Sequence, residues 1–239
     1  TSSTVNHIDH CLGCLACETT CPSGVRYSHL LEEARPRLEN NFRRSAGDAL
    51  LRKVLTYLLP HPALLRPVLR MSSIGKRLKF LLPAQWRNLL ELAPSSMPPP
   101  ARVARTGVIQ AQGQKRARIA FLTGCAQQVL GPGINDSSVR TLTRLGAEVV
   151  VPPALGCCGS LPYHMGERRH SLKLMRRAVL ALSEELETGG LDAIAVSTSG
   201  CGPAMREYGH IFRDDPDLAE KATAVAGLVK DISEVISDL

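Results

Sequence analysis

The spacing of hydrophobic residues changes near residue 117 and divides the chain into two parts. Between residues 29 and 92, leucines recur at intervals of three and four residues, which predicts helices. Four prolines interrupt this stretch, so we expect short helices rather than long ones. These prolines are Pro60, Pro62, Pro67 and Pro83.

From residue 117 onward, short apolar runs alternate with longer stretches of helical spacing. This order of strands and helices, with short connections, is typical of a parallel sheet with right-handed crossovers. The predicted strands are 119–122, 147–151 and 192–196. The predicted helices are 136–145, 164–187, 203–211 and 217–237.

Residues 93–116 are polar and proline-rich and lack periodicity, which predicts a linker. The domain organisation that follows is a helical segment over residues 1–92, the linker, and an α/β domain over residues 117–239. We therefore predict an α+β protein overall, in which the second domain is built on a parallel sheet.

Composition favours a folded chain with an unevenly placed charge. Hydrophobic residues make up 44% of the 239 residues, which is enough for a buried core. The net charge is +7, and residues 22–92 alone carry +8. These basic helices suit an acidic membrane surface, an acidic partner or an ordinary solvated face. Aromatic residues make up only 4%, and no DNA- or RNA-binding module is recognised, so we expect no nucleic-acid partner.

No apolar run reaches the length of about 18 residues that a membrane-spanning helix requires. The sequence also shows no signal peptide. We therefore expect a cytoplasmic protein, with peripheral attachment at the inner face of the cell membrane as the alternative.

Eight cysteines form two groups that lie more than 100 residues apart. A small secreted domain uses scattered cysteines as a disulfide frame, whereas clustered cysteines in a longer chain without a leader favour metal binding or redox chemistry. The first group is Cys11, Cys14, Cys17 and Cys21, and the second is Cys125, Cys157, Cys158 and Cys201.

The first group has the spacing C-x2-C-x2-C-x3-C-P, which is the bacterial ferredoxin pattern for a [4Fe–4S] cluster. Such short gaps allow one loop to wrap its thiolates around one cluster. In two-cluster ferredoxins the fourth cysteine ligates the other cluster. We therefore expect Cys11, Cys14 and Cys17 to bind one cluster, and Cys21 to reach a neighbouring one.

This assignment leaves the fourth ligand of the first cluster unidentified. Either a partner half-motif is missing from the N-terminal side, or Cys21 closes the same cluster. Zinc is an alternative, although zinc sites prefer paired C-x2-C knuckles. Unpaired reduced thiols are the remaining alternative.

Each cysteine of the second group follows a predicted strand. Parallel strands bring their carboxyl ends to one edge of the sheet, so the four thiols are predicted to converge there. Flanking glycines allow backbone amides to approach the sulfurs of a cluster. An iron–sulfur site is the favoured interpretation, and zinc, thiol–disulfide chemistry at Cys157-Cys158 and inert buried cysteines are the alternatives.

These residues together resemble the iron–sulfur subunit of bacterial glycolate oxidase. The first matching stretch is residues 11–27, CLGCLACETTCPSGVRY. The other matches are the elements around Gly124-Cys125, Gly156-Cys157-Cys158-Gly159 with Tyr163-His164, and Ser199-Gly200-Cys201-Gly202 with Glu207-Tyr208-Gly209. The resemblance extends through most of the chain, including the proline-broken basic helices.

Members of that family have two ferredoxin-type motifs and two cysteine-rich domains, so the resemblance implies that this chain is a fragment. Residues 1–92 would hold the second ferredoxin-type motif and residues 117–239 the first cysteine-rich domain. Many such domains end in Cys-x-x-Cys, whereas this chain has Cys201-Gly-Pro-Ala204. That difference leaves four candidate ligands in the second group.

The resemblance further implies an electron-transfer role. The subunit would pass electrons from a flavin subunit, which oxidises glycolate to glyoxylate, towards a quinone or another acceptor. The isolated chain is then expected to be inactive. The alternatives are a heterodisulfide-type thiol–disulfide reductase subunit and the iron–sulfur subunit of a related lactate or glycerol-3-phosphate dehydrogenase. His164 and His170 are candidate proton carriers, although core or solvated histidines are the favoured interpretation.

Overall fold

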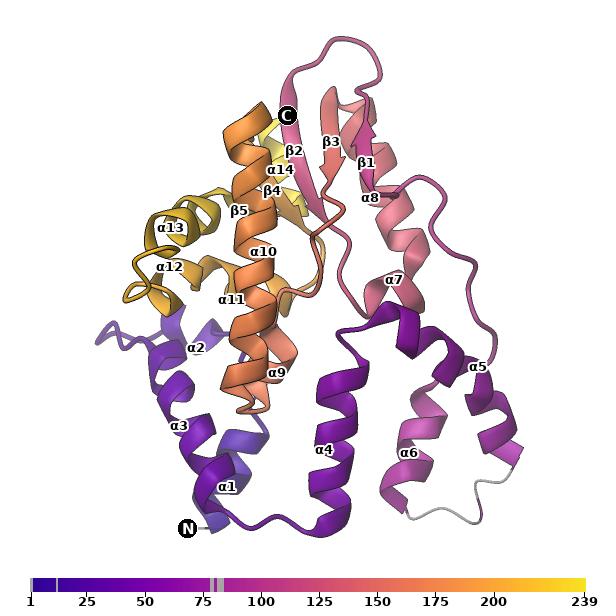
Figure 1. The fold of residues 1–239 in the computed structure, drawn as a ribbon, viewed down its shortest axis with the longest axis vertical. Coiled ribbons are helices and arrows are strands. Elements are labelled where there is room, and N and C mark those ends of the chain that lie inside the picture. Colours follow the sequence, from indigo (N-terminus) through magenta and orange to yellow (C-terminus); the bar gives the residue numbers. More distant parts are fainter. Residues whose placement is uncertain (1, 12, 78–79, 81–83) are drawn as a thin grey trace.

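The computed structural model describes residues 2–11, 13–77, 80 and 84–239. Its first part is helical, and its second part is a sheet with helices on both faces (Figure 1). The predicted α+β class is therefore confirmed. The helices of the first part are α1 (Ser2–Asp9), α2 (Ala16–Thr19), α3 (Tyr27–Asn41), α4 (Ala46–Leu58), α5 (Pro62–Arg77) and α6 (Ala84–Leu92).

Prolines divide these helices only in part. Pro62 begins α5, where its missing N–H is not needed. The prediction that Pro67 breaks the stretch was wrong, because α5 continues through it. A proline removes one backbone hydrogen bond, and the helix tolerates that loss here. Pro83 and the basic residue Lys79 lie outside the described residues.

The second part contains five strands in the order β1-β3-β2-β4-β5. The three predicted strands are confirmed as the parallel centre of this sheet, and an outer strand flanks each side. β1 is antiparallel to β3, and β5 is parallel to β4. The strands are β1 (Gly107–Ile109), β2 (Ala117–Leu122), β3 (Ala147–Val151), β4 (Ala193–Val196) and β5 (Val229–Asp231).

Two sequence predictions needed correction at the outer strands. Residues 93–116, predicted to be a linker, contain β1. The carboxylate of Asp136 also fixes this stretch by accepting hydrogen bonds from the backbone N–H groups of residues 102–104. The predicted helix 217–237 is interrupted by β5, because Asp231 forms a capping box with Glu234 and starts a new helix.

Alternate strand residues face two separate cores. Ala120 and Leu122 pack with one group of helices, whereas Ile119 and Phe121 face the other side. The first core includes α10, α11, α12 and α13, and the second includes α8 and α14. The helices of this part are α7 (Gln127–Leu130), α8 (Pro132–Arg144), α9 (Ser160–His164), α10 (Arg168–Gly189), α11 (Cys201–Arg206), α12 (Tyr208–Ile211), α13 (Ala219–Leu228) and α14 (Ile232–Asp238).

The helical part lies beside the carboxyl ends of the parallel strands. α9, which follows β3, contacts α4, and its last residue, His164, is hydrogen-bonded to Arg35 of α3. Among the described residues, no helix combines the length and the apolar character needed to cross a membrane. The arrangement therefore places the first cysteine loop near the end of the sheet where the second cysteine group lies.

Candidate functional site

The first cysteine group lies on a tight loop between α1 and α3. Gly13 and Leu15 adopt left-handed backbone conformations, with φ values of 67° and 58°. These residues turn the chain sharply between successive cysteines. The short helix α2 then carries Cys17. Cys14 and Cys17 are exposed, whereas Cys11 and Cys21 are half-buried.

The loop supplies hydrogen-bond donors to one of its own thiols. The backbone N–H groups of Val25, Ser23 and Gly24 lower the pKa of the Cys21 thiol. Donors of this kind favour the thiolate, which is the form that binds metal. The local fold therefore suits Cys21 as a metal ligand.

Arg35 of α3 connects this loop to the second domain. The arginine is only 7% exposed. Its guanidinium donates to the backbone carbonyl of Cys11 at 2.6 Å and to Nδ1 of His164 at 2.6 Å. Burial and the neighbouring Arg35 charge lower the pKa of His164 to about 4, so this imidazole is neutral near pH 7. His164 is therefore an interface residue rather than a solvated one.

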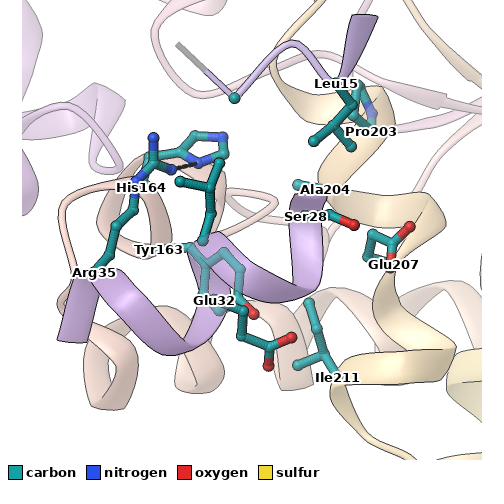
Figure 2. A pocket seen from close by; sticks show the side chains of 12 residues that line it. Leu15, Ser28, Glu32, Arg35, Tyr163, His164, Pro203, Ala204, Glu207 and Ile211 are labelled. Carbon is teal, nitrogen blue, oxygen red and sulfur yellow. Dashed lines mark hydrogen bonds between the residues drawn. The ribbon is translucent and has the colours of Figure 1, made fainter. Parts of the chain in front are cut away.

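Residues of α3, α9 and α11 line a small cavity of about 40 Å³ (Figure 2). Glu32 lies on one side of it, buried, and accepts from Arg168 at 3.1 Å. Its carboxylate is also 3.4 Å from Nε2 of His210. The rings of His210 and His29 stack with centroids 3.5 Å apart, and His29 lies 3.1 Å from Glu207. Charged and aromatic contacts thus join the two parts of the chain on this side.

The second cysteine group comes together at the carboxyl ends of three parallel strands. Cys125 follows β2, the adjacent Cys157 and Cys158 follow β3, and Cys201 follows β4 at the first turn of α11. The Cys125 thiol interacts with that of Cys157, Cys157 with Cys158, and Cys158 with Cys201. The predicted convergence of these side chains is therefore observed.

These contacts divide the thiols into two kinds. Contacts with the Cys125 and Cys158 thiols, together with the hydrogen bond from the N–H of Gly159, lower the pKa of Cys157. Contact with the Cys158 thiol likewise lowers the pKa of Cys201. Cys125 and Cys158 have raised pKa values because of the same contacts and their burial. Half of the group is thus prepared to ionise, and a positive metal centre would favour the thiolate at all four.

Hydrogen bonds from remote residues hold the three loops of this site. The buried Tyr208 hydroxyl donates to the carbonyl of Cys158 at 2.6 Å. Ser160 donates to the carbonyl of Gly200 at 2.8 Å and thereby ties the Cys158 loop to the Cys201 loop. Near Cys125, the amide of Gln127 donates to Ser197 at 2.8 Å. Sequence reasoning missed these supporting roles, although Tyr208 stands in one of the motifs of the resemblance.

His170 lies on α10 close to this site. Its ring interacts electrostatically with Cys157, and its Nε2 is buried with no hydrogen-bond partner among the described residues. The Tyr57 ring is 4.6 Å away. Burial lowers the pKa of His170. His170 as a residue is half-buried, between the core and solvated positions that the sequence favoured, and the role of proton carrier stays a prediction.

The donor set of the second group suits an iron–sulfur cluster. Its four thiols come from three loops to one site, where Cys157 and Cys158 are buried and Cys125 and Cys201 are half-buried. The N–H of Gly159 also donates to the sulfur of Cys157 at 3.4 Å, as backbone amides do to the sulfurs of such clusters.

Comparisons with known proteins agree with the cysteine pattern. Residues 119–206 match the family described as "Cysteine-rich domain", and this range contains the whole second cysteine group. No solved structure gives a significant match.

Two glycolate oxidase proteins match almost the whole chain. The chain is 35% identical over 240 residues to "Glycolate oxidase iron-sulfur subunit" of Escherichia coli (strain K12), covering 100% of this chain and 55% of that protein. It is 31% identical over 241 residues to "Probable glycolate oxidase iron-sulfur subunit" of Bacillus subtilis (strain 168), covering 96% of this chain and 53% of that protein. The resemblance stated above is therefore confirmed, and the chain spans about half the length of these relatives.

A third relative matches a shorter part of the chain. "Lactate utilization protein A" of Bacillus licheniformis is 32% identical over 120 residues, covering 50% of this chain and 48% of that protein. Relatives named for two different substrates thus share sequence with this chain.

Proposed function

We propose that this chain is an iron–sulfur electron-transfer part of a glycolate oxidase (dehydrogenase) complex. The observation that carries the proposal is the convergence of Cys125, Cys157, Cys158 and Cys201 from three loops at the carboxyl ends of the parallel strands. The ferredoxin spacing of the first group supplies a second site. Similarity along almost the full chain to glycolate oxidase iron–sulfur subunits supports the choice of complex.

Under this proposal the two groups bind separate centres. Cys11, Cys14 and Cys17 ligate one [4Fe–4S] cluster and Cys21 a neighbouring one. The second group, Cys125, Cys157, Cys158 and Cys201, ligates a further centre. When bound, such a cluster accepts and releases single electrons. The chain's own contribution is to hold the thiolates, to donate the N–H of Gly159 to sulfur, and to bury Cys157 and Cys158.

Substrate oxidation is placed on a partner. Oxidation of glycolate to glyoxylate releases two electrons and two protons, and a flavin on another subunit would take both electrons before passing them on singly. A quinone at the membrane, or another acceptor, would receive them. We expect the isolated chain not to oxidise glycolate, because no residue of it is proposed to bind the substrate.

Thiol–disulfide chemistry is a second candidate function. The lowered pKa of Cys157 beside Cys158 supports it, because a thiolate next to a second thiol can attack a disulfide. In that case the adjacent pair would be the reactive centre, and no metal would be needed at the second site.

Metal analysis separates these functions. Iron, acid-labile sulfide and zinc per chain are measured after anaerobic purification of the wild type, Cys125→Ser and the matched control Ser199→Ala, an exposed residue two positions before Cys201. We expect Cys125→Ser to lose most of the second-site iron and sulfide, and the control to lose none. Iron that is unchanged in Cys125→Ser would favour thiol chemistry, and zinc without sulfide would overturn the electron-transfer proposal.

A further inference from the structure

The first cysteine loop contacts the second domain at a position where only glycine fits. Gly13 lies between Cys11 and Cys14, and a Cβ atom added to it would lie 2.7 Å from Cε1 of His164. Its φ of +67° is also unfavourable for other residues. The backbone of the loop therefore rests directly on the imidazole of α9.

Arg35 holds the same two elements from the other side. Its guanidinium donates to the carbonyl of Cys11 and to Nδ1 of His164, at 2.6 Å in each case. A guanidinium has no acceptor, so Nδ1 of His164 must accept and its proton lies on Nε2. One buried cation thus satisfies the loop backbone and the imidazole together, and Figure 2 shows Arg35 and His164 side by side.

α9 leads from this contact to the second cysteine site. The helix spans Ser160–His164 and therefore begins two residues after Cys158. Its first residue donates to the carbonyl of Gly200, the neighbour of Cys201. Five helical residues thus separate the contact with the first loop from the loops that carry the second group.

We propose that Arg35 and His164 are positioning residues that fix the first cysteine loop against α9 and so set the distance between the two cysteine sites. This inference rests on the proposed function, since a fixed distance matters because the rate of electron transfer falls steeply with separation. The pair touches no reacting atom. Its role is to keep the two cysteine sites at a fixed distance from each other.

The first test measures the loop itself and needs no cluster. Amide hydrogen exchange of residues 11–21 is followed in the anaerobically purified full chain, for wild type, Arg35→Met, His164→Leu and His164→Gln. Loss of a hydrogen bond to a charged group predicts exchange at least about tenfold faster in Arg35→Met and His164→Leu. His164→Gln keeps an acceptor near Arg35 and should restore most of the protection. Arg37→Met, on the exposed face of α3, is the matched control.

If the Arg35 and His164 variants unfold, two glycine variants test the same contact by hydrogen exchange. Gly13→Ala and Gly24→Ala carry a similar backbone strain, with φ values of +67° and +61°, but Gly24 has nothing within 4 Å of an added Cβ. Only Gly13→Ala should separate the loop from α9 and speed its exchange. Equal exchange in both glycine variants, or a loop as unprotected in the wild type as in Arg35→Met, would overturn the proposal.

The second test reads the distance between the sites. In the reduced chain, electron paramagnetic resonance measures the magnetic coupling between the cluster of Cys11, Cys14 and Cys17 and the centre of the second group, together with iron per chain. We expect weaker coupling in His164→Leu with iron unchanged, and recovery in His164→Gln. Unchanged coupling in His164→Leu would overturn the positioning role. A wild type without iron would instead overturn the proposed function, while hydrogen exchange would still decide the contact.

Discussion

The two cysteine sites are built in opposite ways. The first lies on one loop of eleven residues, from Cys11 to Cys21, and two of its cysteines are exposed. The second draws on three loops spread over the chain, and Cys157 and Cys158 are each only 3% exposed. A local loop can form a site from its own turns, whereas a dispersed site exists only when the sheet and its helices are folded.

Because of this difference, substitutions should affect the two sites differently. The second site shares hydrogen bonds and packing with the domain core, so changes there act on the free energy of unfolding as well as on metal binding. The first site is connected to the domain through the hydrogen bonds of Arg35 to Cys11 and His164. Variants that affect one site and leave the other intact are therefore the sharpest test of the comparison.

The largest effect is expected from Gly159→Ala at the second site. Gly159 has a φ of +78°, and an added Cβ would lie 2.6 Å from the side chain of Met175 and 3.0 Å from the Ser171 carbonyl. Backbone strain and overpacking together predict a loss of about 3 kcal/mol in the free energy of unfolding, measured by urea denaturation. Iron at the second site should fall in parallel.

Gly156→Ala is the matched control for that variant. It lies in the same loop, and nothing is within 4 Å of an added Cβ. Its free energy of unfolding should change by no more than about 0.5 kcal/mol. Equal losses in the two glycine variants would show that the loop is not packed against α10 as described.

The contact between Arg35 and His164 should make the free energy of unfolding depend on pH, by an amount similar to or smaller than the loss in Gly159→Ala. The pKa of His164 is lowered from 6.5 to about 4 by burial and by Arg35. The folded chain therefore binds fewer protons than the unfolded chain between these values, so stability rises with pH. The contribution of His164 to the free energy of unfolding is fully present above about pH 6.5 and is lost as the pH falls through about 4. This loss is at most about 3 kcal/mol.

His164→Gln isolates this contribution, because glutamine does not titrate and keeps an acceptor for Arg35. Urea denaturation of both proteins from pH 7.5 to pH 4 should give curves that diverge below pH 6.5, with the wild type losing more stability. Parallel curves would mean that His164 is not held neutral by its surroundings. The first loop would then be less firmly connected to the domain than the comparison of the two sites requires.

Sequence alone predicted the central elements of the fold and the grouping of the cysteines. The strands 119–122 and 147–151 were found because buried parallel strands give continuous apolar runs. β1 and β5 were missed, since each has three residues and owes its pairing to a neighbouring strand. The rule that parallel strands end at one edge was sufficient to predict that Cys125, Cys157 and Cys201 converge.

The contacts that hold the sites could not be predicted in this way. Arg35 and His164 are 129 positions apart, and Tyr208 and Cys158 are 50 apart. No periodicity or local motif pairs such residues, because their contact depends on how folded elements pack. The basic charge of residues 22–92 was similarly ambiguous, and part of it proved to be Arg35, Arg44 and Arg52 in buried or half-buried hydrogen bonds.

The smallest of the expected effects tests how far the second site depends on distant residues. Tyr208 is fully buried, and its hydroxyl donates to the carbonyl of Cys158. Tyr208→Phe keeps the ring and removes this donor, which predicts a loss of about 1 to 2 kcal/mol in the free energy of unfolding. Tyr57→Phe, whose side chain is 46% exposed, should change it by no more than about 0.5 kcal/mol. Because the Cys158 backbone would also be freed, the electron paramagnetic resonance signal of the second centre should shift in Tyr208→Phe while that of the first stays unchanged. A shift of both signals would show that the two sites are coupled through the domain core as well as through α9.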